Sequence, residues 1–299
     1  MDSFYLVIIM KNGTIVHDMF ATTHKDLVAK YLTHEDVKEN NYFKCVYRPK
    51  DGYRLKDVDN YQLINSGMYY PDWFTPEFKT KTMSKLKTII KSMIVNKRKK
   101  LLLHEGVILV NGAVAEEVKH SIIFGMFDNS KIEILDETSE VHIMTDNAVI
   151  DEMVDGSKVV EMYGFSKINV MKDYAKILKM YGRAKVGKMY DNSSIAILKG
   201  DANITEMYDD AHANRLKHMS RVDEMHGHSV IEELWDWSVV EKMFDNSRIN
   251  NMGEESKVLE MYGDSMIENM SGNAIIEKLY ENSLVRKLRD AAQILSKEI

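Results

Sequence analysis

The chain has 299 residues and a formal net charge of −6, and its 44% hydrophobic and 29% charged residues are typical of a folded protein rather than a disordered one. Its single cysteine excludes an internal disulfide framework and a zinc site built from several cysteines. No apolar run reaches the roughly 18 residues of a transmembrane helix, and the start of the chain lacks the features of a signal peptide. We therefore expect a cytoplasmic protein without a membrane span.

The composition changes along the chain. Residues 1–120 hold 19 Lys/Arg and 14 Asp/Glu, a net charge of +5, whereas residues 121–299 hold 21 and 32, a net charge of −11. All three prolines and the cysteine lie before residue 77, and methionine is unusually frequent, with 21 residues. This asymmetry predicts two structural units with different surfaces.

The segment 1–65 predicts a small α/β domain. An Asn12-Gly13 turn joins two apolar runs into a β-hairpin, and Thr22-Thr23 precedes a short helix as its cap. Cys45 lies on a further strand that ends at the Lys50-Asp51-Gly52 turn, so we expect this cysteine in the core rather than as a nucleophile. The expected hairpin strands, helix and third strand span residues 4–10, 14–20, 24–32 and 42–48.

Residues 66–104 predict an aromatic linker, at 66–78, and then a basic amphipathic helix over 79–103. Apolar residues recur there at helical spacing, at Met83, Leu86, Ile90, Met93 and Ile94. One interpretation is that this apolar stripe caps the first coil of the repeat region that follows, because an open sheet edge must be covered. The alternative is a basic surface that binds nucleic acid or another anion. The residues expected to make such contacts are Lys91, Lys97, Arg98, Lys99 and Lys100.

From Ser121 the chain reads in nines, as SIIFGMFDN, SKIEILDET and SEVHIMTDN, and 19 such repeats follow without insertion or deletion as far as residue 291. The first position is Ser or Ala and the sixth is Met or Leu in all 19 repeats. The third is Ile or Val except at Ala213, and the eighth is Asp, Glu or Gly except at His218. A fixed period of this kind indicates a repeat architecture and decides the fold.

A helix is incompatible with this period, because apolar positions in successive repeats would alternate between opposite faces. A strand fits: positions 1 and 3 point inward, the β-branched third residue suits a pleated sheet, and position 6 returns inward. Positions 7–9 make the corner, since Asp-Asn-Ser and Gly-Asn-Ala are turn sequences. The predicted fold is mainly β: a parallel β-solenoid over 105–299, ending in a short C-terminal cap at 291–299.

Each coil could hold two repeats or three, so that stacked positions differ in number by 18 or by 27, and we favour two. With 18, rings stack at Tyr190, Tyr208, His226, Phe244, Tyr262 and Tyr280. The acidic row Glu137, Asp155, Asp173, Asp191 and Asp209 then lies opposite Gly164, Gly182 and Gly200. With 27, the ladder is instead Phe127, Val154, Tyr181, Tyr208, Trp235 and Tyr262.

The nonapeptide S/A-x-I/V-x-x-M/L-Y-D/G-N, as in SKVVEMYGF (157–165) and SKVLEMYGD (256–264), resembles the short-repeat β-solenoid proteins of bacteria and their phages. In its logic it is similar to pentapeptide-repeat proteins, whose rods can imitate a duplex and inhibit DNA-binding enzymes. The resemblance covers roughly 105–295 and implies the architecture. It departs from the pentapeptide pattern in period, and from the calcium-binding nonapeptide roll in lacking paired glycines and a fixed Asp, so neither DNA mimicry nor calcium binding carries over to any residue.

Aromatic residues are the candidate partner-binding side chains. Trp235 and Trp237 with Phe244 are the best candidates, because Trp is costly to expose without a purpose. The position-7 ring row adds Tyr190, Tyr208, Tyr262 and Tyr280, although stacking within the solenoid would also explain these rings. The acidic row could be catalytic, but it recurs with the turn and is better explained by it. His212, His218, His226 and His228 cluster where the repeat rules break.

These features favour a non-enzymatic binding protein. Its rigid acidic solenoid would engage a macromolecular partner, most simply a protein, and a phage-type inhibitor or anti-defence role fits the design. One alternative is nucleic-acid binding through residues 79–100, and a second is a carbohydrate-active solenoid enzyme. No P-loop, dinucleotide fingerprint, G-x-S-x-G or H-E-x-x-H motif occurs, so we assign no catalytic residue, metal or cofactor.

Overall fold

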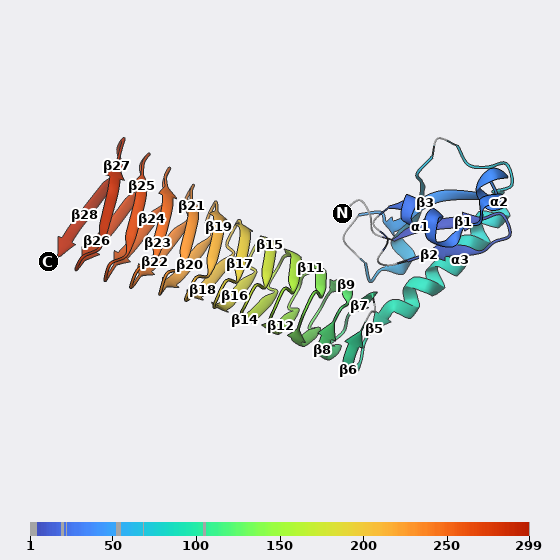
Figure 1. The fold of residues 1–299 in the computed structure, drawn as a ribbon, viewed down its shortest axis with the longest axis horizontal. Coiled ribbons are helices and arrows are strands. Elements are labelled where there is room, and N and C mark those ends of the chain that lie inside the picture. The colour runs from blue at the N-terminus through green and yellow to red at the C-terminus, as the bar shows by residue number, and fades with distance from the viewer. Residues whose placement is uncertain are drawn as a thin grey trace. The chain divides into compact units, whose positions relative to one another are not determined.

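The fold was analysed in a computed structural model (Figure 1), which describes residues 5–18, 21, 23–51, 55–67, 69–103 and 106–298. The chain divides into two compact units. Unit 1 comprises residues 1–95 and 106–108, and unit 2 comprises residues 96–105 and 109–299. Each unit is described by itself.

Unit 1 contains a four-stranded antiparallel sheet in the order β2-β1-β3-β4. The predicted hairpin, helix and third strand are confirmed, while the strand β4 and two short helices were not predicted. Phe4, Met19, Phe20, Thr22 and Gly52, which belong to predicted elements, lie outside the described residues. The elements are β1 (Leu6–Met10), β2 (Ile15–His17), α1 (His24–Tyr31), α2 (His34–Lys38), β3 (Tyr42–Pro49), the 3₁₀ helix η1 (Val58–Asn60) and β4 (Tyr61–Asn65).

Capping and burial explain why these elements form. The Thr23 hydroxyl accepts from the Asp26 N–H while the Asp26 side chain accepts from the Thr23 N–H, a capping box that fixes the start of α1. Leu27 of α1 packs in a core cluster with alternate residues of β1. Cys45 is fully buried on β3, and its thiol donates to the Val7 carbonyl, which confirms its place in the core.

The predicted helix is α3 (Pro76–Met93), and its extension to residue 103 is wrong. After Met93 the chain forms β5 (Ile94–Val95) and β6 (Arg98–Leu103). The pairing of β6 with β8 decides this, because Leu102 lies opposite Val118 in the ladder and both are fully buried. Tertiary pairing thus overrides the helical propensity of a Lys/Arg/Leu-rich segment. The role of α3 as a cap on the first coil stays a prediction.

The aromatic linker is a packed segment of unit 1. Phe74 lies 4.5 Å from Phe43 of β3 between ring centroids, and Tyr70 stacks on Phe74 at 5.4 Å. Phe78, in the first turn of α3, meets Phe74 at 5.6 Å. Further along α3, the Lys85 ammonium donates to the Gly13 carbonyl and Lys87 pairs with Asp59 of η1. These contacts hold α3 against the small domain.

Unit 2 is a parallel β-solenoid, with successive coils stacked like rungs in Figure 1. One sheet holds the even-numbered strands: β6, β8 (Val114–Lys119), β10 (Lys131–Leu135), β12 (Val149–Met153), β14 (Lys167–Met171), β16 (Lys185–Met189), β18 (Asn203–Met207), β20 (Arg221–Met225), β22 (Val239–Met243), β24 (Lys257–Met261), β26 (Ile275–Tyr280) and β28 (Gln293–Glu298). The odd-numbered strands form the other sheet: β9 (Ile122–Met126), β11 (Glu140–Met144), β13 (Lys158–Met162), β15 (Lys176–Met180), β17 (Ser194–Leu198), β19 (His212–Leu216), β21 (Val230–Leu234), β23 (Arg248–Met252), β25 (Met266–Met270) and β27 (Leu284–Leu288). Most of β7 (Gly106–Leu109) is assigned to unit 1.

The register shows two repeats per coil. Ile132 lies opposite Ile150 and Met153 opposite Met171, so within the nonapeptide repeats paired strand residues lie 18 positions apart. The coil of two repeats is confirmed, the coil of three is wrong, and the solenoid has about 11 turns. The predicted C-terminal cap is strand β28, which pairs with β26 as a further rung.

The interior follows the repeat. Third and sixth positions are fully buried through most of the solenoid, as Ile168 and Met171 show, and the first position is buried Ser or Ala. The inward serines have two fates. Some donate to the carbonyl of the preceding turn, as Ser166 does to Tyr163 at 2.8 Å. The side-chain hydroxyls of seven others have no hydrogen-bond partner among the described residues: Ser130, Ser157, Ser193, Ser220, Ser229, Ser247 and Ser265.

Candidate functional site

Each coil turns at two corners, made by positions 7–9 of its two repeats. We call the turn at 127–129 and its equivalents in all later coils the first corner, and the turn at 136–138 and its equivalents the second corner. The eighth residue has a positive φ in all 19 repeats, between 52° and 72°. Asp tolerates this left-handed conformation better than most residues, and glycine adopts it freely, which explains the Asp and Gly residues at this position. Glu137, Glu254, Glu281 and His218 adopt the same conformation.

The carboxylates at the eighth position form a ladder with the backbone. The N–H of one eighth residue donates to the side chain of the eighth residue in the next coil, as Asp173 N–H does to Asp191 at 3.2 Å. Nine such bonds, of 2.5–3.3 Å, occur among the described residues. The acidic row therefore satisfies backbone donors that the left-handed turn directs along the solenoid axis.

Neighbouring carboxyls in the ladder affect each other. The His218 N–H and the carboxyl of Glu254 both hydrogen-bond Asp236, and together they lower the Asp236 pKa. The same contact with Asp236 raises the pKa of Glu254. Stacked acids thus differ in proton affinity according to what each one accepts.

The predicted ring ladder runs along the second corner. Tyr190, Tyr208, His226, Phe244, Tyr262 and Tyr280 stack with centroids 4.6–5.1 Å apart and planes within 11°. The four inner rings are stacked on both faces, so only their edges remain for a partner, whereas Tyr190 and Tyr280 are stacked on one face. The Tyr208 hydroxyl donates to Glu206, which raises the Tyr208 pKa to about 12.

The two tryptophans have different surroundings. The ring of Trp235 lies over Gly253 of the next coil, where a Cβ would overlap it, so this indole covers a neighbouring turn. Trp237, two positions later, is 64% exposed. Of this pair, Trp237 is the side chain available to a partner.

Five consecutive turns of the first corner differ from its other turns in the residues at positions 7–9, and we call them the variant corner. Four of the five ninth positions carry Phe165, Arg183, Met219 and Trp237, with 60%, 67%, 61% and 64% exposed surface. At this corner the ninth position is otherwise Asn, Glu or Ala outside these five turns. The turns are Tyr163-Gly164-Phe165, Tyr181-Gly182-Arg183, Lys199-Gly200-Asp201, Lys217-His218-Met219 and Trp235-Asp236-Trp237.

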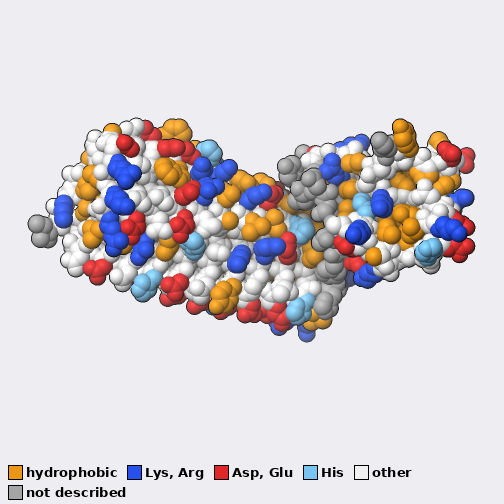
Figure 2. All heavy atoms as spheres, turned by 45° about the horizontal axis from the view of Figure 1, so that its top comes forward, with side chains coloured by type: hydrophobic (Ala, Val, Ile, Leu, Met, Phe, Trp, Pro, Cys, Tyr) orange, Lys and Arg blue, Asp and Glu red, His pale blue; other side chains and the backbone are white. Residues whose placement is uncertain are grey.

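Positive charge gathers around the variant corner. Lys199 and Lys217 make no ion pair with any described residue, and neither do Lys167 and Lys185, which begin the strands after two of these turns. Arg183 lies 5.5 Å from the Phe165 ring centroid, with Asp201 at 3.8 Å. On the face shown in Figure 2, acidic side chains are frequent along one edge of the solenoid.

The predicted basic residues are split between two elements. Lys91 lies exposed on α3, whereas Lys97, Arg98, Lys99 and Lys100 lie at the start of β6 and just before it. Arg98 pairs with Glu116 at 2.6 Å and with Glu133 at 3.0 Å, so its charge is compensated by the next two coils of the same sheet.

The histidines of the irregular repeats are not brought together as a metal site. His212 pairs with Glu232, His218 lies at the first corner, and His226 stacks inside the ring ladder. Among the residues described, no group of three His, Cys, Asp or Glu side chains is placed to hold a metal ion.

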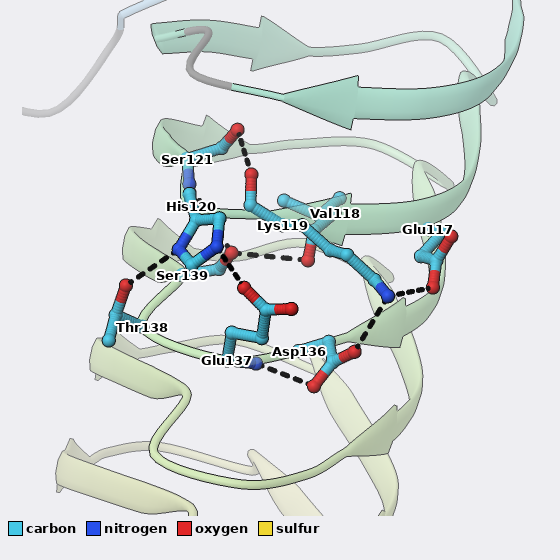
Figure 3. Close-up of polar contacts among 9 residues, drawn as sticks. All are labelled: Glu117, Val118, Lys119, His120, Ser121, Asp136, Glu137, Thr138 and Ser139. Carbon is cyan, nitrogen blue, oxygen red and sulfur yellow. Dashed lines mark hydrogen bonds and ion pairs between the residues drawn. The ribbon is translucent and has the colours of Figure 1, made fainter.

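The first complete coil shows a local polar network (Figure 3). Lys119 bridges Glu117 at 2.8 Å and Asp136 at 3.3 Å, while His120 contacts Glu137 and Thr138. The buried hydroxyl of Ser139 donates to the Val118 carbonyl. These contacts tie adjacent turns together where the repeat begins.

The sequence pointed to Trp235, Trp237 and the ring ladder, but not to Phe165, Arg183 and Met219. Comparing ninth positions at intervals of 18, rather than nine, would have found them.

The chain matches no family model, no curated protein and no solved structure. Within the described part of the chain, no helix is long and apolar enough to cross a membrane.

Proposed function

We propose that the protein is a non-enzymatic binding protein, and that its solenoid engages a partner protein through the variant corner. The observation that carries this proposal is the concentration of exposed Phe165, Arg183, Met219 and Trp237 at the ninth positions of five successive turns of one corner, which Asp201 completes. Aromatic residues, Met and Arg are enriched at protein interfaces, and Trp and Arg supply many of the residues that dominate binding energy.

The backbone beneath these side chains is already ordered. The Phe165 N–H donates to the Asp146 carbonyl at 2.9 Å, and the Arg183 N–H donates to the Gly164 carbonyl at 3.1 Å. A surface held in this way loses little conformational entropy on binding. Five turns at a spacing of roughly 4.8 Å place the outermost ones about 19 Å apart, which suits a standard protein interface.

The acidic residues support a binding role over a catalytic one. Asp191 and Asp209 each accept a backbone N–H from the preceding coil. Carboxylates used in this way stabilise the turn and recur along both corners, so they do not form a single localised pair of the kind that glycoside hydrolysis uses.

The test is quantitative capture of partner proteins from the native host on immobilised wild type and two variants. Trp237→Ala removes an exposed ring from the variant corner, and Tyr174→Ala removes an equally exposed ring, also 64%, from the ninth position of the second corner. We expect Trp237→Ala to lose the captured protein and Tyr174→Ala to retain it. Equal retention by both variants, or no protein enriched over a blank matrix, would contradict the proposal.

A further inference from the structure

The carboxylate ladder is interrupted at the variant corner. Asp146, Gly164, Gly182 and Gly200 are consecutive eighth residues, and their N–H groups have no hydrogen-bond acceptor among the described residues. The cause is in the next coil, where the eighth residue is glycine at 164, 182 and 200 and histidine at 218. No other stretch of either corner in the described solenoid leaves four successive donors in this state.

The glycines leave open the position that a carboxylate takes elsewhere. A Cβ on Gly164 would lie 3.2 Å from the Asp146 nitrogen, one on Gly182 3.6 Å from the Gly164 nitrogen, and one on Gly200 3.2 Å from the Gly182 nitrogen. A side chain on these residues would thus point at the unused donors. Asp146, Gly164 and Gly182 are exposed residues and Gly200 is half-buried, so this stretch of the corner lies at the surface.

The chain itself shows what these donors bind. In the coil after Gly200, the His218 N–H donates to a carboxylate oxygen of Asp236 at 2.9 Å, and at the start of the same corner the Asp128 N–H donates to Asp146 at 3.1 Å. The interruption therefore lies between two stretches of the same corner where carboxylates occupy the equivalent place.

Charge around the interruption favours an anion. Lys199 and Lys217 occupy the seventh position of successive turns, and Lys167 and Lys185 occupy the second position of the repeats that follow two such turns. None of the four forms a salt bridge with a described residue. The charge of Lys217 also acts on Glu233 and Asp236. Backbone donors aligned in one direction and surrounded by cations form an anion-binding surface.

We propose that the interrupted ladder binds an acidic segment of the partner protein, whose Asp and Glu carboxylates accept from the N–H groups of Asp146, Gly164, Gly182 and Gly200. This rests on the proposed function and names the chemistry of its partner. A peptide fits better than a nucleic acid, because the chain's own occupants of this ladder are carboxylates. The apolar Phe165, Met219 and Trp237 beside the donors match the mixed side chains of a protein segment.

The experiment supplies the missing acceptor by substituting one glycine of the interrupted ladder. Gly182→Asp introduces a carboxylate that would accept from the Gly164 N–H, and Gly182→Asn introduces a neutral acceptor at the same place. Asp occupies this backbone conformation elsewhere, with φ of 54° at Asp191, so the variants fit the fold. Gly263→Asp is the control, since it adds the same charge at an eighth position of the second corner, where a Cβ would lie 3.1 Å from the nearest backbone atom.

The probes are a fluorescein-labelled peptide of alternating Glu and Leu residues, a Gln/Leu peptide of equal length, and a labelled oligothymidylate, each titrated by fluorescence anisotropy. We expect wild type and Gly263→Asp to bind the Glu/Leu peptide with equal affinity and to reject the Gln/Leu peptide. Gly182→Asp should weaken binding at least tenfold, and Gly182→Asn should weaken it by a smaller factor. Circular dichroism checks that each variant is folded.

Three results would overturn the inference: no binding of the Glu/Leu peptide to wild type, equal binding to wild type and Gly182→Asp, or tighter binding of the oligothymidylate than of the peptide. The capture experiment separates this inference from the proposed function. If Trp237→Ala loses the partner while Gly182→Asp retains it, the binding function stands and the carboxylate-binding role is wrong.

Discussion

Replacing Asp191 tests the physical basis of the corners. Its side chain accepts from the Asp173 N–H at 3.2 Å, its own N–H donates to Asp209 at 3.3 Å, and its φ is 54°. Asp191→Ala removes the acceptor and leaves a residue that is strained in the left-handed conformation. Asp191→Gly removes the acceptor but relieves the strain, and Asp191→Asn keeps an acceptor on a residue that tolerates positive φ.

The expected losses of stability follow from the lost hydrogen bond and from the strain of the left-handed conformation. Loss of one hydrogen bond costs about 0.5–1.5 kcal/mol. A left-handed residue without local side-chain compensation costs roughly 1–2 kcal/mol, of which Asp already bears a part. We therefore expect Ala to lower the free energy of unfolding by about 1–2 kcal/mol, Gly by about 0.5–1 kcal/mol and Asn by less than about 0.5 kcal/mol.

Two measurements check this order. Urea unfolding followed by circular dichroism gives the midpoints, which are comparable if the slopes agree. Amide hydrogen exchange at Asp173 reports the bond itself, and protection there should fall in the Ala and Gly variants and persist in the Asn variant. If Ala and Gly leave the Asp173 amide as protected as in wild type, or if Asn destabilises as much as Ala, then the ladder does not stabilise the turn and the reasoning fails.

Two further predictions concern the interior and the basic strand. Ser157→Ala should leave the urea midpoint unchanged or raise it, because the buried Ser157 hydroxyl has no partner among the described residues. Ser166→Ala loses the hydrogen bond to the Tyr163 carbonyl and should lower the free energy of unfolding by about 1 kcal/mol. The reverse order would contradict the hydrogen-bond assignment. Because Arg98 is already paired with two glutamates, wild type and a Lys97→Gln/Lys100→Gln variant should bind duplex DNA equally weakly at low salt. Tight binding that falls steeply with salt and is lost in that variant would instead establish the nucleic-acid alternative.

Much of the solenoid could be predicted because its rules are local and repeated. A third-position Ile or Val, a sixth-position Met or Leu and a turn at positions 7–9 recur along the 19 repeats, so each coil repeats the evidence for the others. The ring ladder from Tyr190 to Tyr280 follows from two repeats per coil alone, and the structure confirms it. The methionine excess has the same origin, since 13 of 21 occupy the buried sixth position.

The end of the helix could not be predicted in this way. Residues 94–103 have the composition of a basic helix, yet Leu102 pairs with Val118 from the next coil of the same sheet. That partner is 16 positions away in the chain, and hydrophobic spacing within the segment carries no information about it. The same limit hid the packing of the aromatic linker, whose Phe74 contacts Phe43 on β3.

By itself the sequence determined the period, the inward residues and the turn at positions 7–9, because each depends on residue types repeated at fixed intervals. The structure decided between two and three repeats per coil. Only the tertiary structure decided what the eighth residue does. Its N–H points along the axis to the side chain of the equivalent residue in the next coil, so an acidic residue in one coil satisfies a donor in the coil before it. In the sequence, a glycine at 164, 182 or 200 is an ordinary turn residue. In the fold, the same glycine has no side chain to accept the N–H of the preceding coil, so that donor is unused.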